Sequence, residues 1–134
     1  MNSYEDVISI KAELSAYRKG VLWVKIDLAK RLILWNDSMQ WNNNFVRSIS
    51  PNHMLHMRDL LSSTSFLQWN EITEQDFAEP DLDSPGEQKF MWEVDVSFSD
   101  GKMKRMGGTK QYPDNWNEFK LMIENISRTP FRLR

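Results

Sequence analysis

The sequence predicts an α+β fold: an antiparallel sheet of about five strands with two amphipathic helices packed on one face. Three observations predict it. Several segments alternate apolar and polar residues, an Asp-Gly pair joins two of these segments, and two further stretches carry apolar residues at helical spacing. The expected order along the chain is β-β-β-α-β-β-α, and the short connections favour antiparallel pairing.

Three strands are predicted before the first helix. Residues 7–14 alternate apolar and polar side chains as a half-buried strand does, with a short helix as the alternative reading. Residues 21–28 alternate in the same way, and residues 31–36 follow after a two-residue connection. These two segments therefore read as a hairpin.

The first helix is expected after a loop. Residues 36–50 are rich in Asn and Ser, whose side chains favour turns over strand pairing. Ser50 can cap a helix and Pro51 suits its first turn, so a helix is predicted over about 51–62. Its apolar residues at helical spacing are Met54, Met57, Leu60 and Leu61.

The end of the chain predicts a second hairpin and a second helix. Residues 90–98 alternate clearly, the Asp-Gly pair at 100–101 suits a tight turn, and residues 102–109 return as the partner strand. Asp114 or Asn115 is the expected cap of the last helix. The apolar stripe of that helix is Trp116, Phe119, Met122, Ile123 and Ile126.

The stretch from Ser99 to Phe119, SDGKMKRMGGTKQYPDNWNEF, resembles a signature of small bacterial proteins of unknown function. The shared features are a hairpin on Asp-Gly, a glycine, Tyr-Pro, Asn-Trp and a helix, and they cover about a sixth of the chain. The resemblance implies a bacterial protein and no particular activity. The residues themselves have structural readings: the glycines end the strand, the proline fixes the approach to the helix, and Trp116 packs onto the sheet.

Length and composition indicate one globular domain over residues 1–134. The chain has 40% hydrophobic and 27% charged residues and lacks cysteine, which excludes disulfides and thiolate metal sites. No apolar stretch reaches the length of a membrane span or a signal peptide. We therefore expect a cytoplasmic protein without membrane contact.

A long acidic loop is predicted at about 63–88, with a short helix capped by Thr73. Seven acids and no base lie between residues 70 and 87. Such a segment is either a solvated loop or a recognition surface, because charge of one sign steers a partner of the opposite sign. The hypothesis is a basic protein partner, as in immunity or inhibitor proteins, bound by Glu74, Asp76, Glu79, Asp81 and Asp83.

An aromatic patch on the second sheet face is the other candidate site. Trp23 and Trp35 lie at the parity opposite the main apolar set of their strands, as do Ile33, Met91 and Met106. If these residues share a face, they form a site for a partner protein or a second copy of the chain. Cover by the long loop is the alternative.

The residues do not predict catalysis, a cofactor or a metal. His53 and His56 could share a helix face but lack a third ligand, and no catalytic motif is present. The alternative function is a small ligand-binding or hydrolase domain with a cleft between the long loop and the sheet, where Asp76, Asp81 or His56 would act. A net charge of −2 argues against nucleic acid. The bases that such binding would need are Lys102, Lys104, Arg105, Lys110, Arg128, Arg132 and Arg134.

Overall fold

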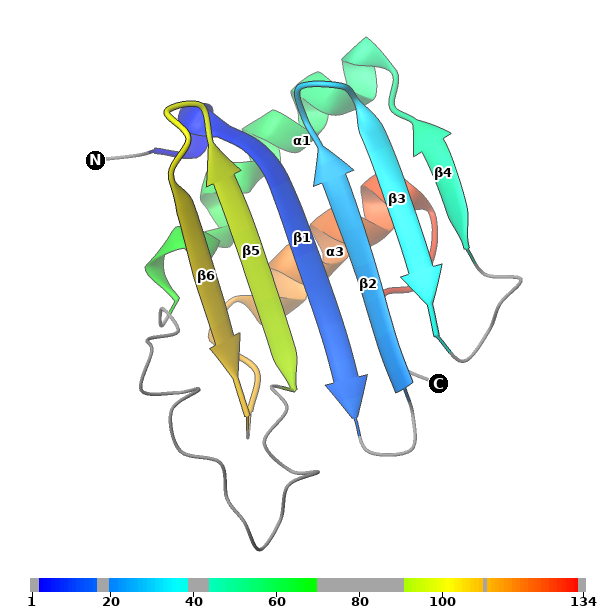
Figure 1. Cartoon of the computed structure of the whole chain (residues 1–134). Helices are drawn as coiled ribbons and strands as arrows, with labels where there is room; N and C mark the ends of the chain where they lie inside the picture. The colour runs from blue at the N-terminus through cyan, green and yellow to red at the C-terminus, as the bar shows by residue number, and fades with distance from the viewer. Residues whose placement is uncertain (1–2, 17–19, 39–43, 70–90, 110, 133–134) are drawn as a thin grey trace, which may run out of the picture.

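The computed structural model describes residues 3–16, 20–38, 44–69, 91–109 and 111–132. Six strands form one antiparallel sheet in the order β4-β3-β2-β1-β5-β6, and the helices α1 and α3 lie side by side across one face (Figure 1). The predicted α+β class is therefore confirmed, with one strand more than expected. The strands are β1 Val7–Ala16, β2 Gly20–Asp27, β3 Leu32–Asp37, β4 Phe45–Ser48, β5 Trp92–Phe98 and β6 Met103–Gly108, and the helices are α1 Pro51–Thr64 and α3 Trp116–Ser127.

The additional strand, β4, lies where the sequence predicted a loop. Its residues pair with β3 in the register Leu34 to Val46 and Trp35 to Phe45. Just before it, the side-chain oxygen of Asn44 accepts a hydrogen bond from the amide of Asp37 at 2.8 Å. An asparagine side chain of the Asn-rich segment therefore hydrogen-bonds to the backbone, as is common in turns, and the short segment that follows forms an edge strand.

Helix α1 begins as predicted and ends two residues later than expected. The hydroxyl of Ser50 accepts the amide of His53 at 3.2 Å, and Pro51 occupies the first turn. Met54, Met57 and Leu61 are buried against the sheet. At this spacing the three side chains lie on one face of the helix, and that face packs against the core.

The hairpin β5–β6 is confirmed, and Gly101 in its turn has a φ of +86°. The predicted cap of α3 is only partly right. Asn115 is the residue before the helix, but it has a φ of +65° and its side chain makes no capping hydrogen bond. Asn tolerates this left-handed conformation, so the residue serves the turn rather than the cap.

Tryptophans fasten the segment before α3 to the sheet. The indole N–H of Trp92 donates to the carbonyl of Gln111 at 2.9 Å, and that of Trp69 donates to the carbonyl of Asp114 at 2.9 Å. Trp116 lies 5.7 Å, between ring centroids, from both of these indoles. These contacts hold the segment before α3, and Trp116 at the start of that helix, onto the sheet.

The segment after α1 contributes to the same core. A short 3-10 helix, Phe66–Gln68, buries Phe66 against Phe119, with ring centroids 5.4 Å apart. The predicted short helix after Thr73 lies outside the described residues. Within the described ranges, no helix is long and apolar enough to cross a membrane.

Candidate functional site

The helices leave one face of the sheet uncovered, and Figure 1 looks onto this face. It carries charged, aromatic and apolar side chains. Side chains of directly paired residues point to the same face of a sheet, so the strand register gives its composition. We call this surface the open face. Its central side chains are Lys11, Glu13, Trp23, Lys25, Leu34, Val46, Glu93, Asp95 and Arg105.

An acidic cluster occupies one half of the open face. Glu13 on β1 pairs with Glu93 on β5, and Asp95 follows on the same side of β5. Burial raises the pKa of Glu93, and the charges of Glu13 and Asp95 raise it further, whereas Arg105 and Lys11 act in the opposite direction. The folded protein thus holds these carboxylates close together at a cost to the ionised form of Glu93.

One edge of the acidic cluster is neutralised within the chain. Arg105 on β6 pairs with Asp95, and its Nε lies 3.0 Å from the carboxylate Oδ1. The Arg105 side chain is 51% exposed and that of Asp95 is 20% exposed, so the pair is open to solvent on its arginine side. An ion pair that is open to solvent in this way contributes little to stability.

A basic and aromatic strip lies beside the acids. Lys11 and Lys25 are directly paired on β1 and β2, and the Nζ of Lys11 lies 5.1 Å from the ring centroid of Trp23. Trp23 is half-buried and also pairs with Glu13. This ring offers a partly accessible aromatic surface beside the carboxylates, and Lys11 itself lies directly opposite Asp95.

An apolar pair lies on the open face where β3 meets β4. Leu34 on β3 pairs with Val46 on β4, and Val46 is 67% exposed at the edge of the sheet. Across β2 and β3, Lys25 pairs with Leu34. From β4 to β5 the surface thus runs from the apolar pair past Lys25 and Trp23 to the acids, among which Lys11 lies opposite Asp95.

The structure places the predicted aromatic residues differently. Trp35 pairs with Val24 and is 2% exposed, so its assignment to a partner site is wrong. Ile33 pairs with Ile26, and Met106 pairs with Val94, so both side chains also lie in the core beneath the helices.

Met91 is partly buried against the core. Trp23 is the one residue of the predicted patch that stays on the open face. Residues 31–36 hold apolar side chains at consecutive positions, so alternation within this strand did not define its faces.

The predicted acidic residues Glu74, Asp76, Glu79, Asp81 and Asp83 lie outside the described residues. Both histidines are exposed on α1, which lies on the helical side and not on the open face (Figure 1). Among the described residues, no group of three His, Asp or Glu side chains could hold a metal ion. The predicted cleft between loop and sheet involves residues 70–88, which lie outside the described residues.

Among the described residues, the bases proposed for nucleic acid lie on different parts of the protein. Arg105 is paired with Asp95, and the ammonium of Lys104 donates to the carbonyl of Leu67 on the helical side. Arg128 lies at the end of α3, near Arg47 of β4, which is the opposite edge of the sheet from β6. Lys110 and Arg134 lie outside the described residues.

The sequence did not reveal two features. The acidic pair needs β5 to lie beside β1, and the apolar end of the open face needs β4. A signal for the second was present in Phe45 and Val46, two apolar residues at the end of an Asn-rich segment. No model of a known protein family matches the chain, and no curated protein is significantly similar to it in sequence.

Proposed function

We propose that this protein is a non-enzymatic binding module that holds a basic protein partner on the open face of its sheet. The observation that carries the proposal is the pairing of Glu13 with Glu93, next to Asp95 and Trp23. Like charges directly opposite one another destabilise a sheet by roughly 0.2–1 kcal/mol. A lysine or arginine from a partner would relieve this repulsion, so the arrangement suits binding better than stability alone.

The neighbouring zones give such a partner an orientation. Trp23 and the apolar pair Leu34 and Val46 supply surface that gains free energy on burial, and aromatic side chains are enriched at binding hot spots. Lys25, which lies on β2 away from the acids of β5, repels a basic side chain placed there. A partner with a basic zone beside an apolar zone can therefore bind favourably in one orientation.

The partner class follows from this charge pattern. A nuclease is a basic protein of the required kind, so an inhibitor or immunity role in the bacterial cytoplasm is the specific form of the proposal. The acids between residues 70 and 87 are the second element of it, since they would extend the attraction to a basic surface.

The test compares affinity capture from the source cells by three forms of the protein. One is wild type, one carries Glu13→Gln and Glu93→Gln, and a matched control carries Asp59→Asn and Glu118→Gln, two exposed acids of the helical layer. The expected result is a basic protein retained by wild type and control and lost by the open-face variant. Calorimetry with the purified partner should then show at least about tenfold weaker binding to that variant.

Two outcomes would overturn the proposal. Equal loss in the control would indicate unspecific attraction by net charge. Equal retention by all three forms would exclude the acidic pair as the binding site.

A further inference from the structure

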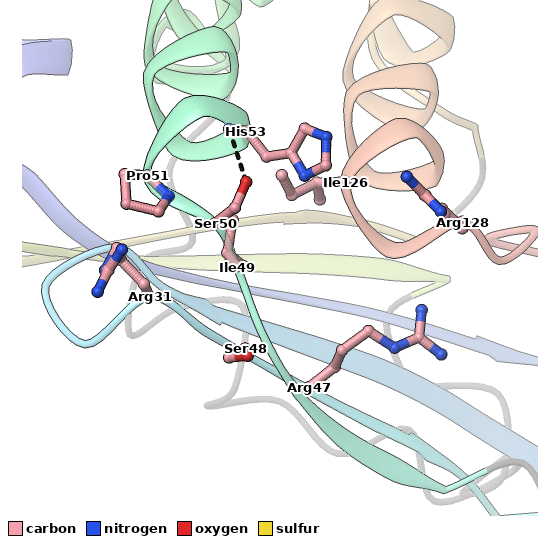
Figure 2. A pocket seen from close by; sticks show the side chains of 9 residues that line it. All are labelled: Arg31, Arg47, Ser48, Ile49, Ser50, Pro51, His53, Ile126 and Arg128. Atoms are coloured by element: carbon pink, nitrogen blue, oxygen red, sulfur yellow. Dashed lines mark hydrogen bonds between the residues drawn. The ribbon is translucent and has the colours of Figure 1, made fainter.

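A basic hollow on the helical side of the protein is separate from the open face. It lies where β4 leads into α1 and where α3 ends, and its volume is about 480 Å³. Figure 2 shows Arg31 at one side of it and Arg128 at the other, with Ser50 and His53 between them. The remaining lining residues are Arg47, Ser48, Ile49, Pro51 and Ile126.

Three cationic side chains reach this hollow from three segments that are far apart in sequence. Arg31 comes from the turn between β2 and β3, Arg47 from β4, and Arg128 from the position after α3. Among the described residues, no acidic side chain lines the hollow. Arg31 and Arg128 also have no ion-pair partner within the described ranges. The concave shape and the charge of a single sign distinguish this site from the mixed open face.

Hydrogen bonds hold two walls of the hollow in place. The amide of Ile49 donates to the carbonyl of Arg31 at 2.8 Å, which ties the β2–β3 turn to the segment before α1. The guanidinium of Arg47 donates to the carbonyl of Ser127 at 2.8 Å. Because a guanidinium has five N–H donors, Arg47 keeps further donors for a ligand. The site is thus built before any ligand arrives.

Arg47 and Arg128 have a second explanation, because cations near the end of α3 stabilise the carbonyl end of a helix. Arg31 belongs to the other side of the hollow, and the end of a helix does not account for it. Arg31 is therefore the residue that distinguishes a binding site from helix capping.

We propose that this hollow binds a small ligand carrying a diphosphate group. Guanidinium groups match phosphate oxygens with paired hydrogen bonds, and the hydroxyl of Ser50 is an additional donor. Since Arg31 and Arg128 lie on opposite walls, two linked phosphates can contact both of them more readily than a single phosphate can. Ile49 and Ile126 offer apolar surface for an organic group attached to the diphosphate.

The test is isothermal titration calorimetry of the full chain with inorganic pyrophosphate, ADP and inorganic phosphate. Wild type should bind one pyrophosphate or ADP per chain with a Kd of about 1 mM or tighter. Phosphate should bind more weakly. Tighter binding of ADP than of pyrophosphate would identify a nucleotide as the source of the diphosphate, and equal binding would identify the inorganic group.

Two variants of the same turn decide the assignment. Arg31→Gln should weaken pyrophosphate binding about tenfold, the value of one charge-assisted contact. Lys30→Gln removes the same charge from an exposed neighbour that does not line the hollow, and it should bind as wild type does. Thermal unfolding of each variant checks that the fold is intact.

Equal losses in the two variants would show diffuse attraction and overturn the proposal, as would the absence of saturable binding to wild type. Arg31→Gln should leave capture of the basic partner unchanged, because the open face lies on the other side of the sheet. The two proposals can therefore fail independently.

Discussion

Glu13 and Glu93 stand directly opposite one another on neighbouring strands, although 79 positions that include the whole of α1 separate them in the chain. Burial and the nearby charges of Glu13 and Asp95 raise the pKa of Glu93. Arg105 and Lys11 offset this effect only in part, on a face that also carries Trp23. The consequences of this carboxylate pair for stability and for binding can be measured separately.

The first prediction concerns pH. Because the pKa of Glu93 is higher in the folded protein than its usual 4.5, the folded state binds this proton more tightly than the unfolded state. The free energy of unfolding therefore falls as the pH rises from about 4.5 through the raised pKa. Glu93→Gln removes this loss, so it should match wild type at pH 4 and exceed it by roughly 0.2–1 kcal/mol at pH 7. Urea unfolding at both pH values measures the difference.

A second background checks the cause. In a protein that already carries Glu13→Gln, the gain from Glu93→Gln at pH 7 should be smaller, since one of the repelling charges is gone. A gain from Glu93→Gln that is the same at pH 4 and pH 7 would contradict the electrostatic origin.

The two faces of the sheet predict different costs for removing a tryptophan. Trp35 is 2% exposed and stacks on Phe45 with ring centroids 5.6 Å apart, so Trp35→Ala should lower the free energy of unfolding by about 3–5 kcal/mol. Trp23 is half-buried on the open face, and Trp23→Ala should cost roughly 1 kcal/mol, including its interaction with Lys11. Chemical unfolding of both variants gives the comparison, and equal losses would refute this division of faces.

The sequence predicted the elements better than it predicted the faces. Leu22, Val24 and Ile26 alternate with polar or amphipathic residues, so the buried side of β2 could be assigned. In β3 four apolar residues are consecutive, and only the pairing of Trp35 with Val24 shows which of them are inside. The pairing register between strands decides which side chains face the core, and the sequence pattern of a single strand does not specify that register.

The candidate sites depend on long-range pairing to an even greater degree. Glu13 meets Glu93 because β5 lies next to β1, and neither the composition nor the spacing of the two segments specifies this strand order. The arginines of the basic hollow come from a turn, an edge strand and the end of a helix. Charge runs are visible in a sequence, whereas these clusters form only after the chain has folded.

A third prediction concerns Gly108. A Cβ added at this residue would lie 2.6 Å from the indole nitrogen of Trp92 and 3.2 Å from the carbonyl oxygen of Gln111. Gly108→Ala should therefore displace the indole, break its hydrogen bond to Gln111, and cost about 2–4 kcal/mol in the free energy of unfolding. The measurement is thermal or urea unfolding together with the NMR signal of the Trp92 indole N–H.

Gly101→Ala is the control for this substitution. Its added Cβ meets nothing within 4 Å, so only its φ of +86° opposes alanine, and the cost should be about 1 kcal/mol. The Trp92 indole signal should stay unchanged in this variant. If Gly108→Ala costs no more than the control, the close approach of Trp92 does not constrain the residue.

The last prediction separates binding from stability on the open face. Arg105 neutralises Asp95 within the chain, so it competes with any basic side chain that a partner brings to the same carboxylate. Arg105→Gln should lower the free energy of unfolding by less than about 1 kcal/mol, because the arginine side of the ion pair is open to solvent. The same variant should bind the basic partner about two- to fivefold more tightly, which is the equivalent of that energy in affinity.

Calorimetry with the captured partner measures the affinity, and Lys120→Gln on α3 supplies the same change in net charge as a control. Tighter binding by both variants would trace the effect to net charge, and weaker binding by Arg105→Gln would show that the partner presents an acid there, against the proposed role of the open face.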